Sequence, residues 1–158
     1  SLEGARPVDL TNFKLEGCRF AVCDTAGFDD IREGPQEGFS NAIHRLKAMG
    51  AVVENLELPQ VQEALVLTGV LFTPEAYGTW KDQIELKPEL MFEEILLRFR
   101  SGANILATDY VAGWQTLDQL RADYYDATSG YDAILMPSSP ILPPNIIRLA
   151  QDHEYDVN

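Results

Sequence analysis

Two adjacent hydroxyl side chains, Ser138 and Ser139, stand in the segment of this chain that says most about its chemistry. They lie between Pro137 and Pro140, directly after the apolar run 133–136. Proline has no N–H to donate to a sheet, so Pro137 marks a strand end and the prolines around it stiffen the loop. A stiff loop at the carboxyl end of a strand suits a ligand pocket, because its shape is fixed before binding. On these residues alone we expect a strand followed by a stiff structural turn, and a ligand pocket shaped by this loop is the alternative.

The serine pair is not predicted to be nucleophilic. A catalytic serine needs a base within hydrogen-bond reach. It also needs backbone N–H groups arranged around the oxyanion. Prolines flank Ser138 and Ser139, and no nearby glycine could bring such N–H groups together. We therefore predict no catalytic residue in this chain.

The cysteine and histidine side chains give weaker evidence for a catalytic or metal-binding site. Cys18 and Cys23 lie five residues apart, at either end of one predicted strand. An odd separation in a strand points two side chains to opposite faces, which makes a disulfide between them awkward. As zinc ligands they lack a second cysteine pair, and His44 is predicted to flank the apolar face of a helix. We expect two reduced thiols and no metal site, a pattern typical of a reducing compartment such as the cytoplasm.

The elements that must position these residues follow an α/β order. The near-continuous apolar run within Arg19–Asp24 predicts a strand covered on both faces. Pro35 fits the first turn of the next helix, whose apolar residues recur at three- and four-residue steps until Gly50 ends it. A second strand over Ala51–Leu58 completes a βαβ unit, a motif whose crossover is almost always right-handed.

The second half is predicted to be mostly helical. Expected helices cover Val61–Leu71, a segment opened by Pro74, Pro88–Arg100 and 109–127, and the last is predicted to be capped by Thr108. A third, buried strand is predicted over Tyr131–Met136. The predicted fold class is α/β, with a mixed sheet, one βαβ unit and covering helices.

Three segments resemble the amidase signature family of hydrolases. Leu15–Val22 is similar to the family's L-x-G-x-R-I-G-V strand, and Ala42–Val53 to its A-x-x-x-L-x-x-x-G-A-x-V helix and strand. Tyr131–Pro140 is similar to the family's Tyr-Asp, apolar run, Pro-Ser/Thr-x-Pro signature near the C-terminus. The three segments occur in the family's order. The resemblance implies that this chain is a C-terminal fragment of the larger amidase signature fold.

The resemblance also implies a division of the chain. An N-terminal loop is expected over 1–14, of which Ser1-Leu2 could be a cloning remnant, followed by the amidase part over 15–145 and a tail over 146–158.

Membership of this family would place the catalytic residues outside this chain. In the family, a Gly/Ser-rich stretch with a nucleophilic serine, a second serine and an activating lysine lies upstream of the matched segments, and this chain has no Gly-Gly-Ser-Ser-Gly run. The resemblance implies a parent enzyme that hydrolyses a carboxamide C–N bond without a metal or organic cofactor. It implies that this fragment alone is inactive and supplies scaffold and a substrate-pocket wall at Pro137, Ser138, Ser139 and Pro140. Ser138 stands where the family often has threonine, which preserves a hydroxyl.

Composition narrows the range of partners. Acidic residues outnumber basic ones by 25 to 12, which gives a formal net charge of −13 and argues against a nucleic acid or an anionic membrane as partner. No apolar run approaches the roughly twenty residues that a membrane helix needs. The expected partner is a small-molecule amide bound by the parent enzyme. A fragment should also expose apolar surface, which could support a homodimer.

Two other classes of protein remain open from the sequence. One is a non-catalytic α/β module that binds a small molecule or a protein and has a closed surface. The other is a thiol or metal enzyme built on Cys18 and Cys23, which would require thiols of lowered pKa.

Overall fold

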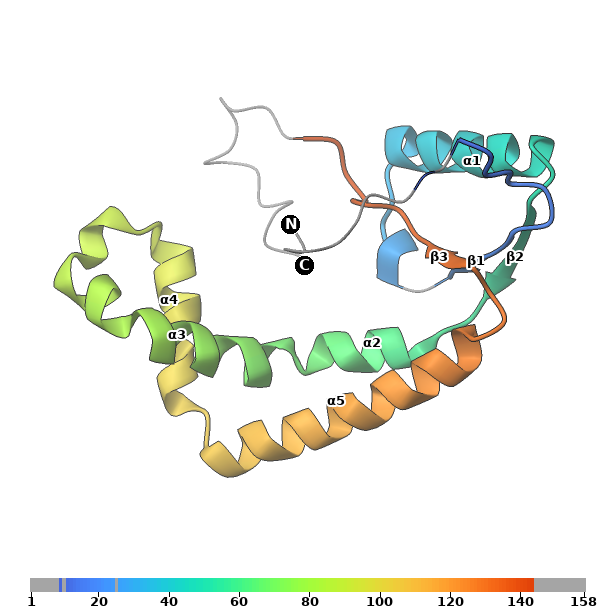
Figure 1. Ribbon diagram of the computed structural model, residues 1–158. Coiled ribbons are helices and arrows are strands. Elements are labelled where there is room, and N and C mark those ends of the chain that lie inside the picture. Colours follow the sequence, from blue (N-terminus) through green and yellow to red (C-terminus); the bar gives the residue numbers. More distant parts are fainter. Residues whose placement is uncertain (1–8, 10, 25, 144–158) are drawn as a thin grey trace. The chain divides into compact units, whose positions relative to one another are not determined.

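The computed structural model describes residues 9, 11–24 and 26–143. Most of the predicted N-terminal loop falls outside this range, as does the predicted tail over 146–158. The elements in chain order are β1 (Arg19–Cys23), η1 (Ala26–Phe28), α1 (Glu33–Ala48), β2 (Val52–Leu56), α2 (Pro59–Val66), α3 (Thr68–Leu86), η2 (Pro88–Leu90), α4 (Glu93–Ser101), η3 (Gly102–Asn104), α5 (Ala107–Thr128) and β3 (Ala133–Leu135), as Figure 1 shows.

The chain divides into two compact units, which are described separately. The first unit comprises Ser1–Leu56 and Gly130–Asn158, and the second comprises Glu57–Ser129. All three strands and α1 belong to the first unit, and α2 to α5 form the second.

A three-stranded sheet in the order β2-β1-β3 forms the centre of the first unit. β1 pairs parallel with β2 from Arg19 opposite Val52 to Cys23 opposite Leu56, and parallel with β3 around Ala21 opposite Ile134. Because β1 is the central strand, its small and branched residues Ala21, Val22 and Cys23 are all buried. The prediction of a strand covered on both faces is therefore confirmed for β1.

The α/β class and the βαβ unit are confirmed, and two details of the predicted sheet differ. A mixed sheet was expected, but both described pairings are parallel, since helical crossovers join β1 to β2 and β2 to β3. The third strand was expected to be buried over Tyr131–Met136, but β3 spans only Ala133–Leu135 and none of its residues is buried. It is an edge strand of the described sheet, so one side of it has no neighbouring strand there to cover it.

Helix α1 begins as the sequence predicts. Pro35 lies in its first turn, and Gly50 follows the C-cap residue Met49 with a φ of +89°, which glycine adopts at little cost. Phe39, Ile43 and Leu46 on the predicted apolar face are half-buried, and no residue of α1 is fully buried.

In the second unit, α2 runs beside α5, and α3 packs against α4, η3 and α5 (Figure 1). Gly102 explains the closeness of α3 and η3, because a Cβ at this position would lie 2.1 Å from the carbonyl oxygen of Thr73 and 2.6 Å from the nitrogen of Pro74. Only a residue without a side chain fits such an approach of two backbones. The buried apolar residues of this unit are Leu58, Leu71, Ala76, Ile84, Leu96 and Leu120.

Two predicted helix starts in this unit are wrong. Pro74 does not open a helix but lies inside α3, where proline removes one backbone hydrogen bond. The Thr73 hydroxyl donates to the Gly69 carbonyl in the same turn, at 2.6 Å. Thr108 lies inside α5 rather than capping it; Leu106 takes the cap position, since its carbonyl already accepts from the N–H groups of residues 109 and 110.

Candidate functional site

The loop after β3 carries the four residues predicted to contact a substrate. Pro137 is buried, Pro140 is half-buried, and Ser138 and Ser139 are exposed. The Ser139 hydroxyl donates to the carbonyl of Ile141 at 2.9 Å and accepts from the N–H of Ile141 at 3.3 Å, so it holds its own turn together. The Ser138 hydroxyl makes no hydrogen bond to any residue that the structure describes. Of the two serines, Ser138 therefore has its hydroxyl available to a ligand.

Contacts with the start of α1 fix this loop in place. The N–H of Arg32, which caps α1, donates to the carbonyl of Pro140 at 2.8 Å. A Cβ on Gly27 would lie 3.2 Å from the Met136 side chain and 3.5 Å from that of Pro137. Farther along, a Cβ on Gly34 would lie 3.3 Å from the Leu142 side chain. Small residues before and within α1 thus let the proline-rich loop pack closely against them.

The loop lies at the carboxyl edge of the parallel sheet. In the strand order β2-β1-β3, the chain passes from β1 to β2 on one side of β1 and then crosses back to β3 on the other side. Because β1 and β3 are neighbours, the loops that follow them leave the sheet next to each other. In open parallel sheets, ligands bind outside the carboxyl ends of the strands at such a reversal of strand order. The loop after β3 thus lies at the sheet edge where open parallel sheets usually bind ligands.

A hollow of about 260 Å³ lies at the same edge, between β1, β2 and α1. Its apolar lining comes from Val22, Phe28, Phe39 and Ile43, and its polar lining from Asp24, Ser40, His44 and Asn55. Sequence reasoning treated His44 as a helix-flank residue and did not single out the other three polar residues. A signal was present: Ser40 and His44 are four residues apart on the helix, and Asp24 directly follows a buried strand.

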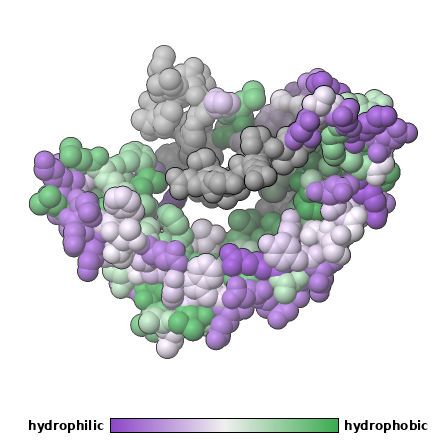
Figure 2. Space-filling view, viewed as in Figure 1, coloured by the Kyte–Doolittle hydropathy of each residue, from purple (hydrophilic) through white to green (hydrophobic). Residues whose placement is uncertain are grey.

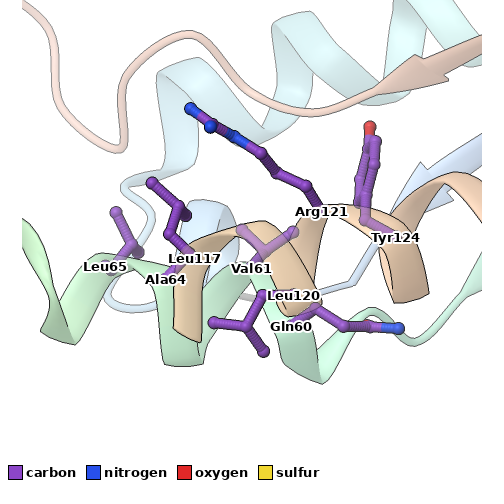
Figure 3. Close-up of a pocket in the computed structure, with 8 residues that line it drawn as sticks. All are labelled: Gln60, Val61, Ala64, Leu65, Leu117, Leu120, Arg121 and Tyr124. Atoms are coloured by element: carbon purple, nitrogen blue, oxygen red, sulfur yellow. The ribbon is translucent and has the colours of Figure 1, made fainter. Parts of the chain in front are cut away.

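The second unit has its own hollow, of about 260 Å³, between α2 and α5 (Figure 3). Its lining residues are Gln60, Val61, Ala64, Leu65, Leu117, Leu120, Arg121 and Tyr124. The lining is mostly aliphatic, and the guanidinium of Arg121 is engaged with Asp118 at 3.3 Å and lies over the Trp114 ring. This surface suits packing better than chemistry, because its described lining contains no carboxylate, histidine, serine or cysteine side chain.

The cysteines give no support to a thiol or metal centre. Cys18 and Cys23 are not joined in a disulfide; Cys23 is buried and Cys18 is half-buried. Within residues 9, 11–24 and 26–143, no three His, Cys, Asp or Glu side chains are grouped so that they could hold a metal ion. No helix in the described part of the chain is both long and apolar enough to cross a membrane.

Much apolar surface of the chain is exposed. Large apolar side chains with more than half of their surface exposed include Leu86, Leu90, Phe92, Leu106 and Leu142. Figure 2 shows several such apolar areas between the polar ones on one face. Large exposed apolar areas are typical of protein–protein interfaces, membrane contacts and ligand-binding grooves.

A small parallel sheet with helical crossovers defines an α/β protein. The sequence model of the amidase family, described as "Amidase", matches residues 8–158. The chain therefore belongs to the amidase family, as its three sequence motifs predict.

Individual relatives agree with this assignment. The chain is 22% identical over 127 residues to an amidase of Pseudomonas putida, a match that covers 80% of this chain and 27% of the relative. It is 26% identical over 150 residues to the A subunit of the glutamyl-tRNA(Gln) amidotransferase of Thermotoga maritima, covering 80% of this chain and 32% of the relative. The chain thus spans about a third of the length of the curated relatives that it matches.

Solved structures show the same fold. A crystal structure of an amidase superposes with a TM-score of 0.72 at 20% identity, covering 84% of this chain and 30% of that one. The A subunit of the Thermotoga maritima amidotransferase superposes with a TM-score of 0.66 at 23% identity, covering 92% of this chain and 32% of that one. The described structure therefore corresponds to a fragment of the amidase fold.

Proposed function

We propose that this chain is part of an enzyme that hydrolyses a carboxamide C–N bond, and that its nucleophilic serine lies outside this chain. The family match over residues 8–158 carries the proposal, together with the share of about a third that the chain covers in its relatives. Alone, the chain is inactive. Its first unit supplies scaffold, and Pro137, Ser138, Ser139 and Pro140 supply a wall of the substrate pocket.

The contacts of the loop support the assigned roles. Pro137 is buried and Pro140 is held by Arg32, so the loop keeps one shape before substrate arrives. A preformed wall lowers the entropic cost of binding. Ser139 maintains the turn, whereas the exposed hydroxyl of Ser138 donates to or accepts from the substrate.

A pair of serine variants in the longer enzyme tests the wall. Ser138→Ala should raise KM several-fold, the loss expected for about one neutral hydrogen bond, and leave covalent labelling by a small fluorophosphonate intact. Ser129→Ala, at the end of α5, is the control and should change neither KM nor kcat. An unchanged KM in Ser138→Ala would remove this residue from the pocket wall, and loss of labelling with the fold intact would make it a chemical group.

We also propose an association partner and a cellular location for this chain. The exposed apolar surface supports association with the rest of the parent enzyme or, in the isolated chain, a homodimer. Two thiols outside any disulfide support a cytoplasmic location. Multi-angle light scattering of the isolated chain tests the homodimer, since a monodisperse monomer over a wide concentration range would exclude it.

A further inference from the structure

The hollow between α1 and the carboxyl ends of β1 and β2 combines one fixed negative charge with aromatic walls. Among the lining residues that the structure describes, Asp24, directly after β1, is the only carboxylate, and none is a lysine or arginine. The remaining polar groups, Ser40, His44 and Asn55, can each donate or accept a hydrogen bond. A ligand that fits these groups carries hydrogen-bond donors and a positive charge.

These polar side chains are available to a ligand. The backbone N–H of Asp24 donates to the carbonyl of Leu56 at 3.2 Å, which fixes the residue at the edge of the sheet. Its carboxylate, however, has no hydrogen bond or ion pair with any residue in the described part of the chain. The same holds there for the side chains of Ser40, His44 and Asn55. Four polar groups therefore line one hollow, and no residue in the described part of the chain uses their hydrogen-bonding capacity.

The apolar side of the hollow is preformed. The rings of Phe28 and Phe39 meet edge to face with their centroids 5.3 Å apart, which joins η1 to α1. Val22 on β1 is buried, and Ile43 lies one helical turn from Phe39. An aromatic ring face attracts a cation, and the aliphatic groups accept a small hydrocarbon body.

We propose that this hollow binds a small organic amine in its ammonium form. The ammonium group pairs with the carboxylate of Asp24 and donates to Ser40 or Asn55, while its apolar body rests against Phe28 and Phe39. The volume of about 260 Å³ is just below the usual range for drug-sized ligands, so the amine is small. The site is distinct from the loop of Pro137 to Pro140, and the proposal does not depend on the amidase activity of the parent.

Titration of the 158-residue chain with benzylamine, followed by amide chemical shifts in NMR, tests the proposal. The expected result is saturable shifts at residues 24, 40, 44 and 55, with benzoate of similar size binding at least about tenfold more weakly. Equal binding of benzylamine and benzoate would overturn the proposal, because it would show an apolar hollow without charge selectivity. Absence of saturable shifts with benzylamine would overturn it as well.

Two acid-to-amide variants distinguish binding in this hollow from non-specific attraction of an amine to an acidic chain. Asp24→Asn should weaken benzylamine binding about tenfold, the loss expected when a charge-assisted hydrogen bond becomes a neutral one. Asp29 lies in the same connection between β1 and α1 but does not line the hollow, and Asp29→Asn changes the net charge by the same amount as Asp24→Asn. The Asp29→Asn variant should bind benzylamine like the unaltered chain. Equal losses in both variants would show non-specific attraction to an acidic surface and overturn the proposal.

Discussion

Replacing Gly102 with alanine should strongly destabilise the second unit. The added Cβ would lie 2.1 Å from the carbonyl oxygen and 2.3 Å from the carbonyl carbon of Thr73, whereas ordinary contacts begin at 3.4 Å. The two backbones must therefore separate to make room for it. Overpacking of a core typically costs about 1–3 kcal/mol. We expect a loss near the top of that range, about 3 kcal/mol, because the atoms met belong to the backbone of α3 and cannot rotate away.

Gly78, which lies in α3, provides the control. A Cβ added at Gly78 would meet no atom within 4 Å, so Gly78→Ala should stabilise the helix by about 0.5–1 kcal/mol through its better helix propensity. Urea unfolding followed by circular dichroism at 222 nm measures both variants. A loss of about 3 kcal/mol is a large part of the roughly 5–15 kcal/mol of a typical domain. If Gly102→Ala unfolds at the same urea concentration as Gly78→Ala, the conclusion that the backbones of η3 and α3 lie in close contact is wrong.

Further predictions concern charge, thiols and apolar surface. Arg100 donates to Glu85 at 2.8 and 2.7 Å, and this contact is the first cause of the lowered pKa of Glu85. The pair therefore stabilises the fold fully above the ordinary carboxyl pKa of 4.5, and this effect is lost as the pH falls through the lowered pKa of Glu85 in the folded chain. Glu85→Gln should lower the Tm slightly at pH 7, and the difference should shrink as the pH is lowered below 4.5, whereas the control Glu63→Gln should show no such difference. Iodoacetamide at pH 7 should alkylate half-buried Cys18 slowly and buried Cys23 only after unfolding, and rapid modification of either would favour a thiol enzyme. The folded chain should bind an apolar dye such as ANS, whereas a closed stand-alone module would not.

The sequence predicts the first unit well because its signals are local. The apolar run of β1, the position of Pro35 and the glycine after α1 each determine structure within a few residues, and all three predictions are confirmed. The partial exposure of β3 could not be predicted, because burial depends on which elements lie beside the strand and the apolar sequence Ala133–Leu135 does not indicate them.

The second unit shows why helix boundaries are harder to predict. Pro74 has the sequence signature of a helix start, yet it lies in the interior of α3, where Gly102 of η3 packs against the same turn. That contact joins positions far apart in sequence and overrides the local preference of proline. The hollow at Asp24 and His44 was missed for a related reason, since its lining comes from two strands, a loop and a helix.

The most direct test of the central claim is fluorophosphonate labelling of the 158-residue chain, with its helical content confirmed by circular dichroism. An active serine hydrolase in the same reaction serves as the control. The account predicts no labelling and no turnover of a simple aryl amide, because the nucleophile lies outside this chain. Stoichiometric labelling, mapped by mass spectrometry to Ser138 or Ser139, would contradict it and would place the chemistry in the loop after β3.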